Sequence, residues 1–254
     1  MVTARSLAMS PSRTLGLLPI PPDHEVHVWI TLLSQVGSDL SALSDRLSPE
    51  EKQKAARFLR AEDRERYIVA HGGLRELLGR YLSTAPAELE FEVNAFGKPS
   101  LCPRQGVRPL SFNLAHSGDV VLYGITGGRP VGVDVEAIRA DLNVLELAQG
   151  QFSTPEVGAL QATRPSEQTA AFFRCWTRKE AYVKARGEGL GFPLKQFSVC
   201  FGDNEPPAVQ WAADDPSASE RWSVFDVVPT PGYAGAVVVE GKTGCLVSRH
   251  WTPK

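Results

Sequence analysis

The chain has 254 residues, of which 43% are hydrophobic and 22% are charged, and its formal net charge is -2. This length suits one large domain or two smaller ones, and the composition excludes disorder as the general state of the chain. The near-neutral charge gives no general attraction to nucleic acid or to an anionic membrane, so a polyanionic ligand would need a local cluster of basic residues.

The four cysteines are widely spaced and contain no CxxC pair. This spacing argues against a zinc site or a disulfide framework and favours a reducing, cytoplasmic environment. Near the N-terminus, proline interrupts the apolar run LGLLPIPP before it reaches the length of a signal peptide or of a spanning helix. We therefore expect residues 1–22 to form a loose lead-in and expect no membrane segment.

The N-terminal half is predicted to combine strands with a long helical region. EVHVWITLL, from Glu25, alternates like a strand, and Ser48 followed by proline and two glutamates starts a helical region that ends near Leu82. The strand FEV, a turn at residues 94–99, and the strands LSFNL and DVVLYGIT joined through AHSG follow. Glycine and proline in residues 126–130 predict a linker near the midpoint of the chain.

The C-terminal half is predicted to open with the strand VGVDVE. One helical region begins near Thr154, and another runs from Ser166 to Arg186, which is about 30 Å at 1.5 Å per residue. The tail returns to the strands FSVCF, AVQWA, RWSVFDVV, GYAGAVVV and CLVSRHW. Each half therefore mixes helices with strands, so the predicted fold class is α+β, with subdomains over residues 23–128 and 129–254.

Two acidic residues in the strand VGVDVE are the first candidate ligands. Strand alternation sends Asp134 and Glu136 to one face, roughly 7 Å apart, and Val133 and Val135 to the other. Two carboxylates at this separation can hold one hard cation between them. A half-exposed strand that turns its acids to water is the alternative interpretation, and this motif alone favours it.

The long helix carries a second candidate pair. Phe172, Cys175, Trp176, Tyr182 and Val183 recur at helical spacing and predict its core face, whereas Thr177, Glu180 and Lys184 share another face. An ordinary surface ion pair is the alternative for Glu180 and Lys184, because glutamate four residues before lysine is the favoured order. The glycines of GEGLG can end the helix and admit a ligand close to the backbone. The chain contains no dinucleotide fingerprint, P-loop, nucleophile-elbow serine or HExxH motif.

GVDVE, followed by WTRKEAYVKARGEGL on the predicted long helix, resembles the paired signature of the Sfp-type 4'-phosphopantetheinyl transferases. SPEEKQKAARFLRAEDRERY, FGKP and FNLAHSG resemble further segments of that family, so the resemblance covers most of the chain. It implies two similar α+β subdomains in a pseudo-twofold arrangement, with the active site in the cleft between them, and a monomeric protein.

The resemblance also implies an activity. Such enzymes move the 4'-phosphopantetheine arm of coenzyme A onto a serine of an apo acyl or peptidyl carrier protein, with Mg²⁺, and release adenosine 3',5'-bisphosphate. The carrier can serve fatty acid, polyketide or nonribosomal peptide synthesis, and neither nucleic acid nor membrane is expected as a partner. Two alternatives stay open on the residues alone: a Mg²⁺-dependent phosphohydrolase of a small nucleotide, and a non-catalytic module that binds coenzyme A or a carrier.

Five residues match the family's signature positions. Asp134, Glu136 and Glu180 match the metal ligands. Lys179 and Lys184 match lysines that contact the coenzyme A phosphates. Glu180 is also expected to be the base for the carrier serine, so Glu180, Lys184 and Asp134 form the predicted catalytic set.

Further upstream, four residues are candidates for binding the nucleotide and its 3'-phosphate, because a net-acidic protein must gather cations locally: Lys54, Arg66, Lys98 and His116. A solvated helix face is the alternative for Lys54 and Arg66, and a satisfied loop histidine is the alternative for His116. The family commonly has serine where this chain has Ala115. We therefore expect 3'-phosphate binding to be weaker or to use Ser117 instead.

Overall fold

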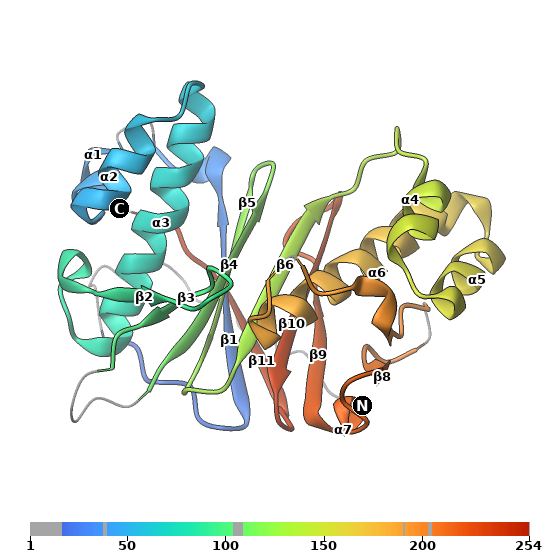
Figure 1. The fold of residues 1–254 in the computed structure, drawn as a ribbon. Helices are drawn as coiled ribbons and strands as arrows, with labels where there is room; N and C mark the ends of the chain where they lie inside the picture. The colour runs from blue at the N-terminus through green and yellow to red at the C-terminus, as the bar shows by residue number, and fades with distance from the viewer. Residues whose placement is uncertain (1–16, 38–39, 104–108, 190, 203–204, 254) are drawn as a thin grey trace.

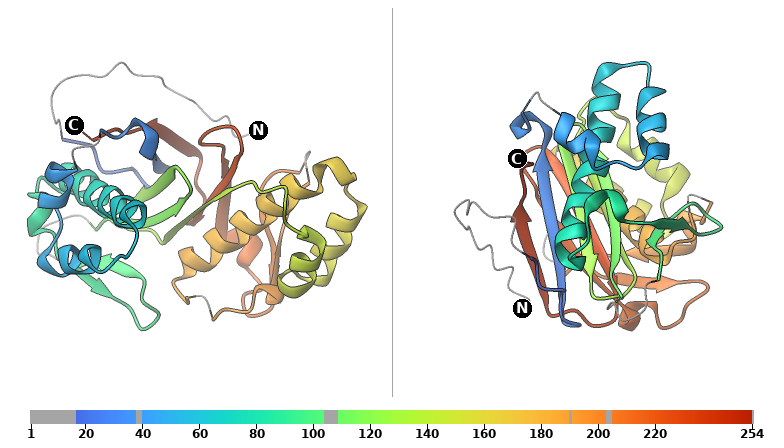
Figure 2. Two further views of the ribbon diagram at one scale, coloured as in Figure 1. Left: turned by 90° about the horizontal axis from the view of Figure 1, so that it is seen from above. Right: turned by 90° about the vertical axis from the view of Figure 1, so that its left-hand side faces the viewer.

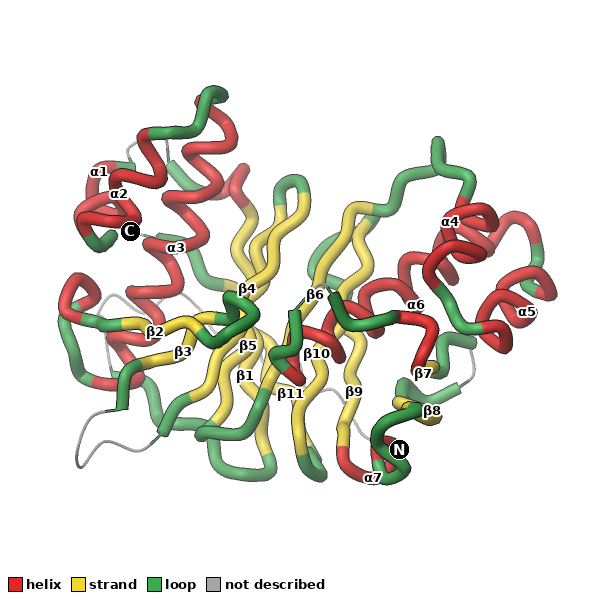
Figure 3. The backbone as a smooth tube through the Cα atoms, viewed as in Figure 1, coloured by secondary structure: helices red, strands yellow, loops and turns green. Residues whose placement is uncertain are grey.

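Two sheets stand side by side at the centre of the molecule, and helices flank them on both outer sides (Figures 1 and 3). The structure is a computed structural model that describes residues 17–37, 40–103, 109–189, 191–202 and 205–253. Its α-helices are α1 (Ser41–Asp45), α2 (Pro49–Ala56), α3 (Ala61–Leu82), α4 (Val144–Gln151), α5 (Thr154–Ala162), α6 (Pro165–Arg186) and α7 (Ala218–Arg221). Most of the predicted lead-in lies outside the described residues.

The first sheet has the strand order β11-β1-β5-β4 and the second has the order β6-β10-β9. Their strands are β1 (Glu25–Leu32), β4 (Ser111–Ser117), β5 (Val120–Thr126), β6 (Val131–Ala137), β9 (Trp222–Val227), β10 (Tyr233–Glu240) and β11 (Cys245–His250). Two further pairs are β2 (Phe91–Val93) with β3 (Pro99–Leu101), and β7 (Phe197–Val199) with β8 (Val209–Ala212). The predicted α+β class is confirmed.

The last strand of the chain returns to the N-terminal sheet. β11 pairs in parallel with β1, with Cys245 opposite Glu25 and His250 opposite Ile30. The prediction had placed residues 129–254 in one C-terminal subdomain, but this strand completes the sheet of the N-terminal half. The alternation in CLVSRHW reveals a strand and contains no information about its distant partner.

Each half contains one helix of 22 residues that covers a sheet: α3 lies on the first sheet and α6 on the second. Seen from above, the two groups of helices lie at opposite ends of the molecule (Figure 2). Capping begins the first helical region as predicted, because the Ser48 side chain accepts a hydrogen bond from the Glu51 amide. That region divides into α2 and α3, while α6 begins at Pro165 and ends at Arg186. The pseudo-twofold relation between the halves stays a prediction.

Two predicted loops are more ordered than their sequences indicate. β4 extends through Ser117, so AHS belongs to the strand and the turn falls at Gly118, whose φ is +53°. Thr126 ends β5 and residues 127–130 connect it to β6, and the Arg129 guanidinium donates to the carbonyl oxygens of Glu25 and Glu240, both at 3.0 Å. This predicted linker is therefore tied to both sheets.

The described part of the predicted lead-in is attached to the N-terminal half. The Leu18 amide donates to the Arg80 carbonyl oxygen at 3.0 Å, and Leu18 and Ile20 pack against the core beneath α3. All four cysteines are free thiols. Within the described residues, no helix combines the length and apolar character needed to cross a bilayer.

The facing edges of the two sheets, β4 and β6, are joined by side chains. Asn113 Oδ1 accepts a hydrogen bond from the Val133 amide at 2.8 Å, and Ser117 Oγ accepts one from the Ala137 amide at 3.2 Å. Valines of β6 and apolar residues of β5 form one core cluster beside this junction. The junction, which we call the β4–β6 seam, places the acidic end of β6 beside the end of β4.

Candidate active site

Gly132 brings α6 directly onto β6. A Cβ atom at this position would collide with the backbone of Ala181 and of Ala185, so only glycine permits the observed approach. Asp134, two residues further along the strand, therefore shares the face that meets the helix, and only 5% of it is exposed. Val133 points the other way, into the core between the sheets.

Asp134 forms an ion pair that uses one of its two oxygens. Lys184 Nζ on α6 donates to Asp134 Oδ1 at 2.6 Å, whereas Oδ2 is buried and has no hydrogen-bond partner among the described residues. Burial raises the pKa of Asp134 to about 7; Lys184 opposes this shift, and the charges of Glu180 and Glu136 add to it. The site thus contains a buried carboxylate oxygen that no basic side chain among the described residues pairs with.

Glu180 and Glu136 complete an acidic group around Asp134. Burial raises the pKa of Glu180 above its usual value, Lys184 lowers it, and Glu136 raises it further. Glu136 accepts a hydrogen bond from Ser117 Oγ at 2.8 Å. Within the described residues, no three acidic, histidine or cysteine side chains form a ready-made metal cage.

This donor set nevertheless suits one kind of ion. Mg²⁺ is usually bound through one or two carboxylates together with substrate phosphates and water, so an all-protein cage is not required. The buried, unpartnered Asp134 Oδ2 is an oxygen donor of the type that Mg²⁺ prefers. The residues present therefore fit a magnesium ion that shares a phosphate ligand.

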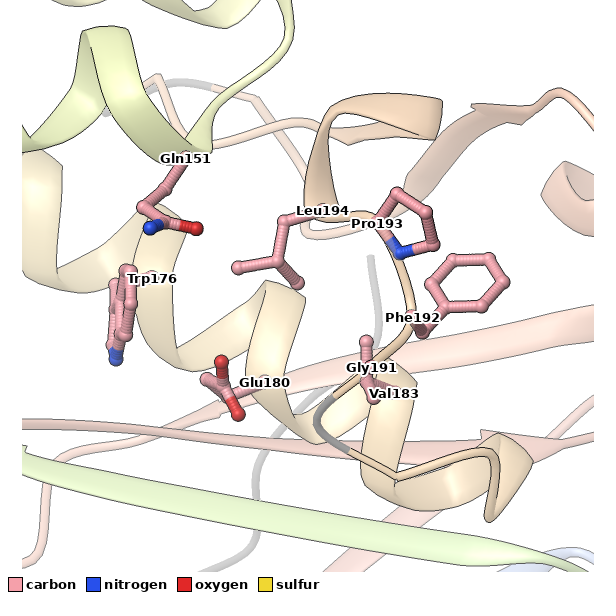
Figure 4. Close-up of a pocket in the computed structure, with 8 residues that line it drawn as sticks. All are labelled: Gln151, Trp176, Glu180, Val183, Gly191, Phe192, Pro193 and Leu194. Atoms are coloured by element: carbon pink, nitrogen blue, oxygen red, sulfur yellow. The ribbon is translucent and has the colours of Figure 1, made fainter. Parts of the chain in front are cut away.

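A cavity of about 420 Å³ lies beside Glu180 (Figure 4). The Glu180 carboxylate lies between Trp176 on the same helix and the loop that follows α6. The wall combines apolar and polar surface, and its lining residues are Gln151, Trp176, Glu180, Val183, Gly191, Phe192, Pro193 and Leu194. Gly187, with φ of +73°, ends α6 and begins this loop, as predicted.

Basic residues from two helices, α3 and α6, surround His116 on β4. The pKa of His116 lies below its usual value because its ring is partly buried and because His71, Lys184 and Arg66 place positive charge near it; Glu136 acts in the opposite direction. Two of the predicted nucleotide ligands, Arg66 and His116, therefore lie in one group with Lys184. The β4–β6 seam brings this group next to the acidic residues.

Lys54 and His71 both lie against the ring of Tyr67. Lys54 Nζ is 5.3 Å from the ring centroid, and the His71 ring stacks on it with centroids 4.0 Å apart. His71 Nδ1 is also 3.7 Å from a Glu51 carboxylate oxygen. Sequence reasoning did not place His71 near His116, although it is the basic, polar member of the periodic series Ile68, His71, Leu74, Leu78 and Tyr81.

Comparisons with known proteins identify the family. The family model described as "4'-phosphopantetheinyl transferase superfamily" matches residues 130–238, and the one described as "4'-phosphopantetheinyl transferase, N-terminal" matches residues 34–125. The 4'-phosphopantetheinyl transferase HetI of Nostoc sp. is 34% identical over 229 residues, which cover 88% of this chain and 93% of HetI. The chain belongs to the 4'-phosphopantetheinyl transferase family.

Two further phosphopantetheinyl transferases share shorter stretches. Sfp of Bacillus subtilis is 32% identical over 153 residues, which cover 60% of this chain and 66% of Sfp. AcpT of Salmonella typhimurium is 44% identical over 113 residues, which cover 44% of this chain and 56% of AcpT. The match to HetI therefore spans both halves, whereas the higher identity to AcpT is confined to a shorter segment.

In this phosphopantetheinyl transferase, Lys179 does not join the acidic group. It is 0% exposed, and its Nζ donates to both carboxylate oxygens of Glu156, at 2.9 and 2.7 Å, and to the Phe197 carbonyl oxygen at 2.8 Å. The prediction that Lys179 contacts phosphate is not supported by this placement. Helical spacing gives the reason, because Lys179 lies three residues after Trp176 and three before Tyr182, on the predicted core face.

Lys98 and Ser117 also have partners within the protein. Lys98 Nζ donates to the carbonyl oxygens of Lys184, Val131 and Ala185, at 2.6, 3.0 and 3.2 Å. The Ser117 hydroxyl bridges Glu136 and the Ala137 amide within the seam. Neither side chain is directed to an open position for phosphate, although both were predicted to bind the nucleotide.

Proposed function

We propose that the protein transfers the 4'-phosphopantetheine arm of coenzyme A to a serine hydroxyl of an apo carrier protein and releases adenosine 3',5'-bisphosphate. Membership of the phosphopantetheinyl transferase family supports the reaction class. The observation that carries the proposal is the Asp134–Lys184 pair with its unpartnered buried oxygen, next to Glu180. A pyrophosphate substrate needs both a carboxylate that holds a cation and a lysine that binds phosphate.

The cations around His116 support binding of the nucleotide end of coenzyme A. Arg66 and His71 come from α3 and Lys184 comes from α6, so basic side chains approach His116 on β4 from both halves. Coenzyme A carries a 3'-phosphate in addition to its pyrophosphate. Two separated phosphate groups match a group of cations that extends from one half to the other.

Asp134, Glu136 and Glu180 would hold a magnesium ion. When bound, Mg²⁺ neutralises the pyrophosphate charge and makes the β-phosphorus more susceptible to attack. Lys184 is 30% exposed at its side chain, so its ammonium group can turn from Asp134 to a phosphate oxygen when another cation occupies the carboxylate. It would then stabilise the negative charge that develops on the departing phosphate.

Glu180 is the proposed proton acceptor. Burial raises its pKa, which makes it a stronger base than an ordinary glutamate. In the transfer, the serine oxygen bonds to the β-phosphorus and the hydroxyl proton passes to the Glu180 carboxylate. The bond between the β-phosphorus and the bridging oxygen breaks, and that oxygen leaves with its electron pair on adenosine 3',5'-bisphosphate.

The cavity beside Glu180 is the proposed position of the pantetheine arm. Its volume of about 420 Å³ falls in the range of small-molecule sites, and the apolar part of its wall suits the methyl groups of the arm. Trp176 and Phe192 belong to this wall, and Gln151 supplies an amide that can pair with an amide of the arm. The reacting end of the arm would then lie at Glu180.

The test is the intact mass of an apo carrier protein after incubation with the enzyme, coenzyme A and Mg²⁺. We expect a gain of about 340 Da, which is lost with EDTA and in Glu180→Gln. Glu167→Gln, on the same helix and partly exposed, is the matched control and should retain the gain. Breakdown of coenzyme A without any carrier would indicate a phosphohydrolase, and binding without any reaction would indicate a non-catalytic module.

A further inference from the structure

The turn between β2 and β3 lies against the C-terminal end of α6 (Figure 1). Lys98 Nζ donates to the carbonyl oxygens of Lys184 and Ala185 in the last helical turn, and to that of Val131 at the start of β6. Asn94 Nδ2 donates to the Gly187 carbonyl oxygen at 2.8 Å. Two side chains of the N-terminal half thus bind the end of the helix that carries Glu180.

The end of a helix needs such donors. Its last carbonyl groups have no amide partner within the helix, and the helix dipole makes this end negative. A lysine ammonium satisfies both demands, because it supplies three hydrogen-bond donors and a positive charge. Burial lowers the pKa of Lys98 to about 8, whereas its three carbonyl partners favour the charged form.

The turn is shaped before it meets the helix. Asn94 Oδ1 accepts hydrogen bonds from the amides of Phe96 and Lys98, both at 2.9 Å, and the Asn94 amide donates to the Lys98 carbonyl oxygen at 3.0 Å. Gly97, with φ of +84°, allows the chain to reverse within this short loop. The Lys98 side chain therefore extends from a constrained backbone, which reduces the entropy lost in holding it against α6.

We propose that Lys98 is a positioning residue, which caps α6 and thereby holds Glu180 and Lys184 in register with Asp134. One of its partners is the carbonyl group of Lys184 itself, and another is at the start of the strand that carries Asp134. The same ammonium group therefore fixes the backbone of the helix relative to the strand. Its effect on turnover rests on the proposed function, whereas its effect on the helix end does not.

The first experiment is hydrogen exchange of the backbone amides at residues 181–187. Lys98→Met keeps the length of the side chain and removes the ammonium group, so we expect exchange there to be faster by about tenfold or more, because breaking a charge-assisted cap favours local opening. Lys242→Met, an exposed lysine outside the site, is the control and should leave this segment unchanged. Unchanged exchange in Lys98→Met would overturn the proposal even if the protein proved to have another activity.

The second experiment separates positioning from phosphate binding. We expect Lys98→Met to lower kcat/KM for coenzyme A about tenfold, since small displacements of reacting groups slow catalysis, and to raise the Mg²⁺ concentration for half-maximal activity. The ratio of kcat/KM for coenzyme A to that for 3'-dephospho-coenzyme A should stay within about twofold of wild type, because a positioning residue acts equally on both substrates. A fall of this ratio toward one would show that Lys98 binds the 3'-phosphate.

Asn94→Ala gives an independent test through an uncharged residue. It removes the bond to Gly187 and the two bonds that shape the turn, and it changes no charge near a phosphate. We expect the same faster exchange and the same unchanged substrate ratio as in Lys98→Met. The loss of kcat/KM in the double variant should be smaller than the losses of the two single variants combined. Fully additive effects, or normal exchange in Asn94→Ala, would contradict the proposed cap.

Discussion

The two sides of α6 each hold a lysine paired with a carboxylate, and the pairs differ in how completely they are satisfied. On the core side, Lys179 donates three hydrogen bonds, two of them to Glu156. Glu156 also accepts from the amides of Ser153 and Val199, both within 2.9 Å. On the side that meets β6, Lys184 donates to one oxygen of Asp134, and the other oxygen has no partner among the described residues.

This difference distinguishes a structural pair from a ligand site. A buried network in which every polar atom is paired holds α5, α6 and β7 together and has no capacity for a ligand. A buried oxygen without a partner is unfavourable until a donor or a cation reaches it. Two lysines five positions apart on one helix therefore have different expected roles, which the following substitutions can separate.

The largest effect is expected from Lys179→Met. This change leaves the Glu156 carboxylate buried without its cation, which should lower the free energy of unfolding by about 3–5 kcal/mol and the Tm by roughly 10 °C. The folded fraction of Lys179→Met should have a KM for coenzyme A within about twofold of wild type, because this buried lysine should not contact the substrate. Thermal unfolding and steady-state kinetics on the same sample measure both quantities.

Lys195→Met is the control for this experiment, because Lys195 is exposed and should change neither quantity. If Lys179→Met had wild-type stability and a strongly raised KM for coenzyme A, the structural role assigned to Lys179 would be wrong. That result would place Lys179 at the phosphates, as the family resemblance implies.

Lys184→Met should have the second largest effect and should act on turnover. Removing the donor proposed to stabilise the departing phosphate should cost about 10²- to 10³-fold in kcat, or roughly 3–4 kcal/mol. The Tm should change by only a few degrees, since the side chain is partly exposed and Asp134 can become protonated when unpaired. Normal turnover in Lys184→Met, measured by transfer to an apo carrier, would exclude this residue from the catalytic set.

Local patterns predicted most elements of the fold because their signals lie within a few residues. The alternation in VGVDVE and the capping residues around Ser48 correspond to β6 and α2 as expected. The pairing of β11 with β1 was not predictable, because the two strands lie at opposite ends of the chain. Nor did AHS look like strand sequence, although pairing with β5 continues as far as Ser117 opposite Val120.

The sequence predicted several individual site residues but not how they come together in space. Periodicity placed Glu180 and Lys184 on one helix face and Asp134 on one strand face, but their meeting depends on Gly132, which lets α6 rest on β6. Lys98 shows the opposite case: FGKP predicts a turn, while the helix end that its lysine caps is remote in sequence. Which distant group a side chain contacts depends on tertiary packing, and a single short motif contains no information about that packing.

The third effect is a pH dependence that Asp134 alone should introduce. Its pKa is about 7 in the folded protein against an ordinary 3.8, so between these values the folded form keeps a proton that the unfolded chain has released. Stability of the metal-free protein should therefore fall as pH rises through this window, by up to about 2 kcal/mol between about pH 5.5 and pH 7.5. Mg²⁺ should restore the loss at the higher pH, because it replaces the proton at the carboxylate.

Urea unfolding of wild type and Asp134→Asn in EDTA measures this contribution. Other titrating groups are common to both proteins, so the difference between their free energies of unfolding isolates Asp134. We expect that difference to shift in favour of the variant as pH rises, and only wild type should gain stability from Mg²⁺. An identical difference at both pH values would mean that Asp134 is ionised throughout.

The smallest effect is expected from Ser117→Ala, which opens one link of the β4–β6 seam. The hydroxyl joins Glu136 to the Ala137 amide, so its loss should cost about 1 kcal/mol of stability. Glu136 would lose its fixed orientation, and the Mg²⁺ requirement should rise about twofold to threefold as a consequence. The preference for coenzyme A over 3'-dephospho-coenzyme A should not change, with exposed Ser219→Ala as the control. A lost preference would instead mean that Ser117 leaves the seam to bind the 3'-phosphate, in place of the hydroxyl that Ala115 lacks.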